Sequence, residues 1–187
     1  PAYRLNGTDR CYHCKRELWT RLTRVAEQRG LAAVIDGTNA DDLGEHRPGL
    51  QAATEYRIHS PLAELGWTKA MVRSAALSLG IPTWDAPASP CLSSRIQYGL
   101  EVTPERLRQV EEAERILRAF GVTGDLRVRH RGEYASVEVN PTQLPWLRDN
   151  WDKLAGELAT LGFTRVELDP RGYRRGALLG ELPLLAR

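Results

Sequence analysis

The three cysteines of this chain are the residues whose type and spacing most clearly allow chemistry. Cys91 lies in the run Pro90-Cys91-Leu92-Ser93-Ser94-Arg95-Ile96, in which an arginine follows the thiol by four residues. A cysteine reacts as its thiolate, and a neighbouring guanidinium favours that form. Cys91 is therefore a candidate nucleophile or sulfur donor. The alternative is that it serves as a small apolar residue of the interior.

The other two cysteines, Cys11 and Cys14, form one C-x-x-C motif. This motif suggests zinc binding, a redox pair or an iron-sulfur ligand. The chain holds no second C-x-x-C, so it cannot complete a four-thiolate zinc site by itself. Together with Cys91 it offers three thiolates, which would leave one iron of a four-iron cluster open to carry an extra sulfur. Three unrelated cysteines remain the alternative.

Two arginines, Arg127 and Arg129, lie two residues apart in a predicted strand. The period of two points both guanidiniums to one face of the sheet, while Leu126 and Val128 point to the other. Two convergent guanidiniums suit a phosphate or carboxylate ligand. The alternative is a strand face neutralised by glutamates on neighbouring strands, Glu138 or Glu167. We interpret the adjacent His130 as a structural residue.

A polar segment follows the apolar run of residues 31–35 and contains Asp36, Gly37, Thr38, Asn39 and Asp42. Small residues, a hydroxyl, an amide and adjacent carboxylates after a strand could hold a nucleotide or help place Mg²⁺ on its phosphates. An Asp-Gly turn explains the same residues equally well.

Helices and strands alternate in the first half of the chain, which is typical of an α/β sheet. The periodicity predicts helices over 15–29, 50–56 and from Thr68 to Gly80, and strands over 31–35 and 57–60. The first strand is continuously apolar, as in a buried parallel strand. Residues 82–99 lack periodicity and predict a long loop that carries Cys91.

The second half predicts a small α+β sandwich of the split βαβ type. The expected elements are a helix over 103–120, strands over 125–130 and 134–139, a helix from Asn140-Pro141 to Leu161, and a strand over 163–168. We place the domain boundary near Leu100, which gives domains of 1–99 and 100–187. The apolar run Leu182-Pro183-Leu184-Leu185 is either an interface or a frayed tail.

The composition gives no strong argument for a nucleic-acid or membrane partner. The chain has 26 Lys and Arg against 24 Asp and Glu, a formal net charge of +2. An odd number of cysteines fits poorly with a disulfide framework. The sequence shows neither an apolar run near 18 residues nor a leader, and we expect a soluble, cytoplasmic protein.

Taken together, the motifs of the chain resemble the LarE family of PP-loop sulfur transferases. The matching runs occur in the family's order and span nearly all 187 residues: RCYHCKREL, DGTNADDL, RPG, SPL, TK, CLSSRI, RVRH and LDPRGYR. The resemblance implies an ATP pyrophosphatase-type (adenine nucleotide alpha hydrolase-like) domain with a Rossmann-like parallel sheet, followed by the small α+β domain. It also implies an enzyme that uses ATP and Mg²⁺ to adenylate carboxylates of pyridinium-3,5-biscarboxylic acid mononucleotide. Sulfur then replaces oxygen twice, on the way to the nickel-pincer nucleotide of lactate racemase.

The resemblance also assigns roles to residues. Cys91 matches the sulfur-bearing cysteine, which in one branch is consumed and becomes dehydroalanine. In another branch three cysteines hold a [4Fe-4S] cluster, and the presence of Cys11 and Cys14 predicts that branch. Ser94, Arg95, Arg127 and Arg129 match the pocket of the substrate phosphate. The loop from Asp36 to Asp42 belongs to the nucleotide side, and relatives form hexamers.

One motif of PP-loop enzymes, S-G-G-x-D-S, is absent from the 187 residues. This motif forms a backbone cradle for pyrophosphate. We therefore expect either a piece of a longer polypeptide or a truncated relative that cannot adenylate. The alternatives to the sulfur transferase are a tRNA-thiolating PP-loop enzyme with a three-cysteine cluster and a noncatalytic remnant. The near-neutral charge argues against tRNA as a partner.

Overall fold

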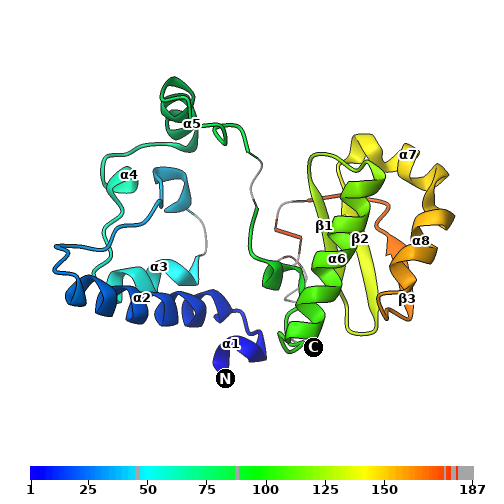
Figure 1. Ribbon diagram of the computed structural model, residues 1–187, viewed down its shortest axis with the longest axis horizontal. Coiled ribbons are helices and arrows are strands. Elements are labelled where there is room, and N and C mark those ends of the chain that lie inside the picture. The colour runs from blue at the N-terminus through cyan, green and yellow to red at the C-terminus, as the bar shows by residue number, and fades with distance from the viewer. Residues whose placement is uncertain (45–46, 87–88, 175, 178–179, 181–187) are drawn as a thin grey trace. The chain divides into compact units, whose positions relative to one another are not determined.

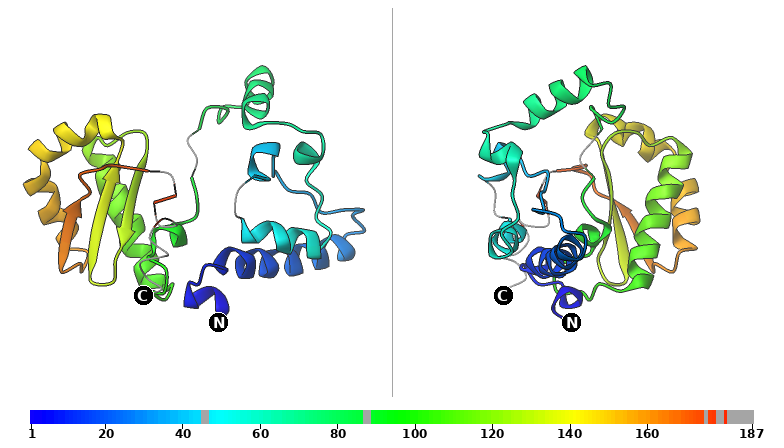
Figure 2. Two further views of the ribbon diagram at one scale, coloured as in Figure 1. Left: turned by 180° about the vertical axis from the view of Figure 1, so that it is seen from behind. Right: turned by 60° about the vertical axis from the view of Figure 1, so that its left-hand side comes forward.

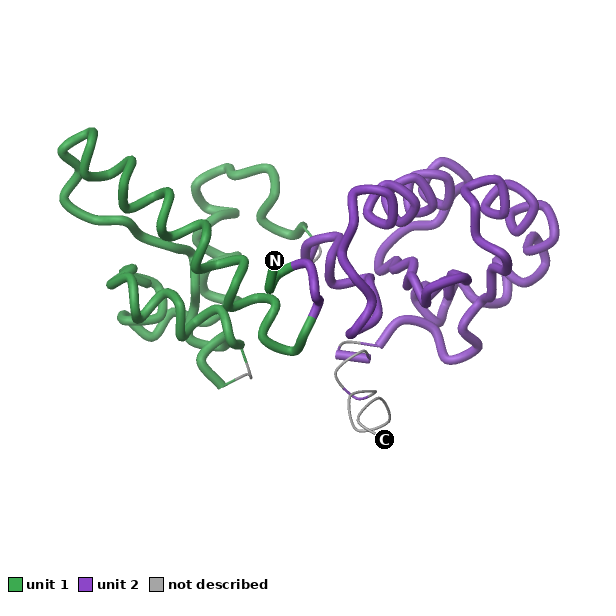
Figure 3. Tube along the Cα trace, turned by 90° about the horizontal axis from the view of Figure 1, so that it is seen from below, with its two compact units in different colours: residues 1–3, 7–86 green, residues 4–6, 87–187 purple. Residues whose placement is uncertain are grey.

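The computed structural model describes residues 1–44, 47–86, 89–174, 176–177 and 180. The chain divides into two compact units (Figure 3), of which unit 1 comprises residues 1–3 and 7–86, and unit 2 comprises residues 4–6 and 87–187. The boundary predicted near Leu100 falls inside unit 2, whose main segment starts at residue 87. The predicted interface or tail at 182–185 lies outside the described residues.

Unit 1 is built mainly from helices (Figure 1). The chain begins with the short helix α1 (Ala2–Leu5). The helices that follow it are α2 (Arg10–Gln28), the 3₁₀ helix η1 (Ala40–Asp42), α3 (Pro48–Glu55), α4 (Pro61–Glu64) and α5 (Lys69–Ser78). The predicted helices are confirmed, although α2 begins five residues earlier than expected. Thr68, the predicted start of this helix, is its N-cap, because its hydroxyl accepts a hydrogen bond from the Met71 amide at 3.3 Å.

The small core of unit 1 lies between α2 and α3. Trp19, Ala52 and Ala53 are buried there, with Val34 and Ile58 packed against them. Gly49 allows the two helices to approach closely, since a Cβ at this position would lie 3.0 Å from Cγ of Lys15.

The prediction of a buried strand over 31–35 is wrong for the structure described. Within the described residues, residues 31–35 form one isolated parallel bridge, between Ile35 and His59. The strand expected over 57–60 is likewise reduced to this bridge. Leu31 is 58% exposed and Ile35 is 65% exposed. A buried parallel strand needs partner strands and a covering layer on each face, and the described part of unit 1 supplies neither. The α/β character of the chain is confirmed, while a Rossmann-like parallel sheet stays a prediction.

Unit 2 contains the three-stranded sheet found in the described part of the chain. After the 3₁₀ helix η2 (Leu92–Arg95) come α6 (Pro104–Phe120), β1 (Leu126–His130), β2 (Tyr134–Val139), η3 (Pro141–Gln143), α7 (Leu144–Asp149), α8 (Trp151–Ala159) and β3 (Arg165–Leu168). The strand order is β1-β2-β3, with β1 antiparallel and β3 parallel to β2. This arrangement confirms the predicted α+β character of the unit. The predicted split βαβ type is wrong for the structure described, because the parallel strands β2 and β3 are direct neighbours.

The single helix predicted from Asn140 to Leu161 is wrong, because the structure divides it into η3, α7 and α8. Pro145 sits in the first turn of α7, where its missing amide costs nothing. At the other end of α7, the Asn150 side chain donates to the Trp146 carbonyl at 2.8 Å, and Asn150 is the N-cap residue of α8. Asparagine binds nearby backbone in this way in competition with helix propagation.

One face of the sheet packs against the helices, and the right-hand view of Figure 2 shows α6 and α8 on the same side of it. The core joins α6, α7, α8 and the inward side chains of β1 and β2. It includes the fully buried Leu117, Val137 and Leu154. The predicted orientation of Leu126 and Val128 is confirmed, since both belong to this core.

The opposite face of β1 and β2 is polar but also buried. Arg127 pairs in register with Glu138, and Arg129 with Ser136. Their exposures are between 1% and 9%. Buried charged side chains of this kind require partners of opposite charge or hydrogen-bond acceptors.

Among the described residues, no helix is long and apolar enough to cross a membrane.

Candidate functional site

Cys91 is exposed and directly precedes η2, for which it is the N-terminal flanking residue. Its carbonyl accepts hydrogen bonds from the Ser94 amide at 2.9 Å and from the Ser94 hydroxyl at 2.7 Å. The Ile96 amide closes the turn on the Ser93 carbonyl at 3.1 Å. Backbone bonds therefore order the turn, which we call the Cys91 turn (residues 90–96), while the thiol stays open to solvent.

Arg95 is buried beneath this turn, with 3% of its side chain exposed. Its Nε and Nη2 donate to the two carboxylate oxygens of Glu114 at 2.9 and 3.2 Å. Its Nη1 donates to the carbonyls of Pro90 and Cys91, the latter at 3.1 Å, and to the Ser94 hydroxyl at 3.3 Å. Arg95 thus contacts the backbone of the Cys91 turn rather than the sulfur atom itself.

Arg129 forms a second buried ion pair in the same region. Its Nε and Nη2 both donate to Oε2 of Glu138, at 3.0 and 2.8 Å, and its Nη1 donates to the Ser94 carbonyl at 3.0 Å. Glu138 is 1% exposed, and among the described residues its Oε1 accepts no hydrogen bond. The pair therefore ties β1 and β2 to the Cys91 turn.

Arg127 lies beside these two cations. Its guanidinium stacks over the ring of Tyr173 at 5.1 Å from the centroid. Tyr173 is held in place by its amide, which donates to the Val139 carbonyl at 2.7 Å. Burial lowers the pKa of Arg127, and the nearby positive charges of Arg95 and Arg129 lower it further. An anion placed here would relieve that repulsion.

The structure thus places four of the predicted substrate residues together in unit 2: Ser94, Arg95, Arg127 and Arg129. Glu138 does neutralise Arg129, as the alternative interpretation of these arginines required, but the face is buried rather than exposed. His130 is 2% exposed and binds Gln109 through Nε2 at 3.0 Å, in agreement with a structural role.

The loop from Asp36 to Asp42 lies in unit 1, and its carboxylates have local partners. Asp36 accepts from the amide and hydroxyl of Thr38 at 3.0 and 2.9 Å, and from the Ser60 hydroxyl at 2.8 Å. Asn39 and Asp42 form a capping box for η1, and Asp42 also pairs with Arg47 at 2.7 Å. Gly37 has open space around its Cα. These contacts describe an ordered turn, and its nucleotide role stays a prediction.

Cys11 and Cys14 are both exposed in the first turns of α2. Residues three apart lie on one face of a helix, so both thiols can serve one ligand. They belong to unit 1, whereas Cys91 belongs to unit 2. The joint cluster of the three cysteines therefore stays a prediction.

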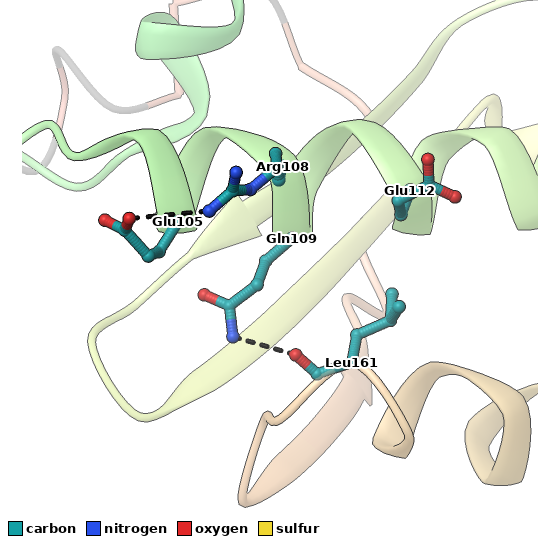
Figure 4. A pocket seen from close by; sticks show the side chains of 5 residues that line it. All are labelled: Glu105, Arg108, Gln109, Glu112 and Leu161. Atoms are coloured by element: carbon teal, nitrogen blue, oxygen red, sulfur yellow. Dashed lines mark hydrogen bonds and ion pairs between the residues drawn. The ribbon is translucent and has the colours of Figure 1, made fainter.

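A shallow pocket of about 310 Å³ lies along α6 (Figure 4). It is lined by Glu105, Arg108, Gln109, Glu112 and Leu161, with Gln109 donating to the Leu161 carbonyl at 2.9 Å. None of the predicted site residues lines this pocket. Gln109 also forms a hydrogen bond with His130 of β1 at 3.0 Å.

Sequence reasoning missed Glu114 and Tyr173, which contact the predicted arginines. Glu114 carried a usable signal, because it lies four residues after Val110 and three before Leu117, both fully buried. A charged residue within the apolar stripe of a helix needs a buried partner. Tyr173 lies in the run LDPRGYR, and nothing in its spacing indicated a contact with Arg127.

Comparisons with known proteins identify relatives over most of the chain. An uncharacterized protein of Synechocystis sp. is 44% identical over 180 residues, which are 95% of this chain and 67% of that protein. A protein of Lactiplantibacillus plantarum named pyridinium-3,5-bisthiocarboxylic acid mononucleotide synthase is 35% identical over 92% of this chain and 62% of its own length. An uncharacterized protein of Methanocaldococcus jannaschii is 34% identical over 90% of this chain.

No family model matches the chain. The chain spans about two thirds of the length of the curated relatives, 67%, 62% and 66% respectively. Its identity to the Synechocystis protein extends over nearly the whole chain, through both units. We conclude that the chain belongs to the family of these proteins, in agreement with the resemblance to LarE that its motifs carry.

Proposed function

We propose that this chain carries the sulfur donor and the substrate-phosphate site of a LarE-type, ATP-dependent sulfur transferase. The substrate would be pyridinium-3,5-biscarboxylic acid mononucleotide. The name of the L. plantarum relative supports the enzyme class and the product. The observation that carries the proposal is the exposed Cys91 on a turn held by Arg95 and Arg129, with Arg127 beside them.

The proposed reaction begins with activation of a carboxylate, which is a poor electrophile. One substrate carboxylate oxygen attacks the α-phosphorus of ATP and releases pyrophosphate, while Mg²⁺ offsets the charge of the phosphates. The Cys91 thiolate then attacks the acyl carbon of the adenylate, and AMP leaves with the electron pair of the acyl–oxygen bond. The product of this step is a thioester between Cys91 and the substrate.

In the sacrificial version a base removes the Cα proton of Cys91. The electrons of that bond form the Cα–Cβ double bond, and the Cβ–Sγ bond breaks. The sulfur departs with the substrate as a thiocarboxylate, and the protein keeps dehydroalanine. In the cluster version Cys11, Cys14 and Cys91 would hold a [4Fe-4S] cluster whose open iron carries the sulfur. Exposed thiols, two of them on one helical face, are a fitting donor set for such a cluster.

The positive charges of unit 2 would hold the anionic substrate during these steps. The cations around Arg127 repel one another, so a substrate phosphate gains from binding there. Ser94, Arg95 and Arg129 would complete this pocket, and orientation by such groups matters most when both reactants are anionic. The loop with Asp36, Gly37, Thr38, Asn39 and Asp42 would shape the nucleotide side. A reducing, cytoplasmic location and a homo-oligomer belong to the same proposal.

The first experiment measures iron and acid-labile sulfide in the protein, purified without oxygen together with whatever sequence flanks this chain. A Cys91→Ala variant, purified in the same way, is the comparison. Near-stoichiometric cluster in the protein and its loss in the variant would support Cys11, Cys14 and Cys91 as joint ligands. Incubation with ATP, Mg²⁺ and the biscarboxylate mononucleotide should then give thiocarboxylate.

Absence of iron combined with loss of H₂S from the mass of the Cys91 peptide after turnover would support the sacrificial version. Neither cluster nor dehydroalanine, together with no thiocarboxylate from an intact and folded protein, would refute the proposed function.

A further inference from the structure

We propose that Glu114 is a positioning residue that orders the Cys91 turn through Arg95. This inference rests on the proposed function, because the orientation of the turn matters for chemistry only if Cys91 delivers sulfur. It assigns a role to a residue on α6 that belongs to none of the motifs carrying the chemistry.

Glu114 collects three hydrogen bonds from two different elements. Its carboxylate receives Nε and Nη2 of Arg95 at 2.9 and 3.2 Å, so that the fork of the guanidinium matches both oxygens. Its Oε1 also accepts the backbone amide of Val128 at 3.0 Å. Glu114 therefore fixes η2 and the outer edge of β1 to the same helix.

Arg95 connects Glu114 to the Cys91 turn through hydrogen bonds. With Nε and Nη2 bound by Glu114, its Nη1 is directed at the carbonyls of Pro90 and Cys91 and at the Ser94 hydroxyl. These groups flank the sulfur-bearing residue on both sides. A guanidinium is planar and rigid, so binding one edge to the carboxylate determines where the other edge points.

Burial makes the carboxylate necessary rather than optional. The Arg95 side chain is 3% exposed and that of Glu114 is 18% exposed. A guanidinium removed from water is held in place only if an opposite charge or several acceptors compensate it. Without Glu114, the cation gains by moving toward water, and the carbonyls of the turn lose their donor.

A second ion pair of similar design, Arg129 with Glu138, holds the Ser94 carbonyl. It acts on the end of the turn that follows the thiol, whereas Glu114 and Arg95 act on the peptide groups of Pro90 and Cys91. The two pairs are therefore not redundant, and loss of Glu114 should loosen the half of the turn that holds Cys91.

The test is amide hydrogen exchange in Glu114→Gln, a change that keeps size and removes charge. The reporters are the Ser94 and Ile96 amides, which close the turn. Losing a charge-assisted hydrogen bond should speed their exchange about tenfold or more. Exchange of amides within β2 should rise only by the factor that a loss of overall stability gives, and exchange at Ser94 and Ile96 should rise by a larger factor. Glu112→Gln is the matched control, because Glu112 lies on the same helix and pairs with Arg115 at the surface.

Because Glu114→Gln leaves a buried cation unpaired, it can lower overall stability. The double variant Arg95→Met/Glu114→Gln removes both charges and should recover the thermal midpoint of the unchanged protein. Exchange at Ser94 and Ile96 should remain fast in this variant. A role limited to stability predicts instead that the midpoint and the exchange rates recover together.

In the complete enzyme, Glu114→Gln should lower kcat for sulfur transfer by a larger factor than it raises KM, since it frees Arg95 of the proposed phosphate pocket but leaves the Arg129–Glu138 pair in place. Unchanged exchange at Ser94 and Ile96 in the folded single and double variants would overturn the inference. An enzyme without sulfur transfer would refute the proposed function alone, because the exchange measurement requires no activity.

Discussion

Helices α2 and α6 have the same kind of apolar periodicity and differ in what covers it. Val110, Ala113 and Leu117 of α6 are fully buried, and the last two belong to the core that α6 shares with the sheet, α7 and α8. On α2, Leu18, Leu22 and Val25 are 39%, 37% and 39% exposed. The comparison teaches that periodicity identifies a helix and its apolar face but does not identify what packs on that face.

The largest expected effect contrasts Leu117→Ala with Leu22→Ala. Leu117 is fully buried, so its truncation should lower the free energy of unfolding of unit 2 by about 2–5 kcal/mol. Leu22 is partly exposed, and its truncation should cost unit 1 less than about 1 kcal/mol. Denaturant titration followed by hydrogen exchange in each unit measures both. Equal costs would mean that the face of α2 is covered in solution.

A second effect belongs to unit 2 and concerns pH. Burial lowers the pKa of His130 to about 4, and the charge of Arg106 contributes. The unfolded chain has a histidine pKa of about 6.5, so between pH 6.5 and 4 it binds a proton that the folded state does not. The stability of unit 2 should therefore fall as pH is lowered through this window, by roughly 3 kcal/mol, and be flat with respect to His130 above it.

Urea titrations across this pH range test the effect, with His130→Gln as the comparison. Glutamine does not titrate, so the variant should lose this part of the pH dependence. A slope that persists in the variant would assign the effect to another group.

The smallest effect concerns two helix caps of the same chemistry. The hydroxyls of Thr103 and Thr68 each accept an amide hydrogen bond at 3.3 Å, at the start of α6 and α5 respectively. Replacement of either by alanine should cost about 1 kcal/mol in the free energy of its unit. Hydrogen exchange should show the loss in unit 2 for Thr103→Ala and in unit 1 for Thr68→Ala. A loss in the other unit would show that the two units unfold together.

The elements that were predictable from sequence are those with local signals. Thr103-Pro104 and Gly121 mark both ends of α6, and the alternation of apolar residues marks β1 and β2. The exposure of residues 31–35, which were predicted to form a buried strand, was not predictable. The sequence shows that these residues are apolar but not whether neighbouring elements cover them. The break at Asn150 depends on a side chain competing with the helix backbone, which a periodic pattern conceals.

For the site, the residue types were predictable, and so was one of the partners. Two arginines on one face of a strand follow from alternation alone, and Glu138 was one of two glutamates expected to neutralise them from a neighbouring strand. The structure pairs Glu138 with Arg129, nine positions away. The pairing of Arg95 with Glu114 joins residues 19 positions apart on different elements and depends on tertiary packing, so that only the charge within the apolar stripe of α6 pointed toward it.

The buried Asn6 has a consequence for how the chain is made. Its side-chain amide donates to the carbonyls of Gln97 and Leu100 at 2.8 and 2.9 Å, so the segment 4–6 is part of unit 2 (Figure 3). During synthesis on the ribosome, about 90 further residues, including all of residues 7–86, must be made before the carbonyls that accept these hydrogen bonds exist. Closing so long a loop is slow relative to local helix formation, and unit 2 is therefore completed last.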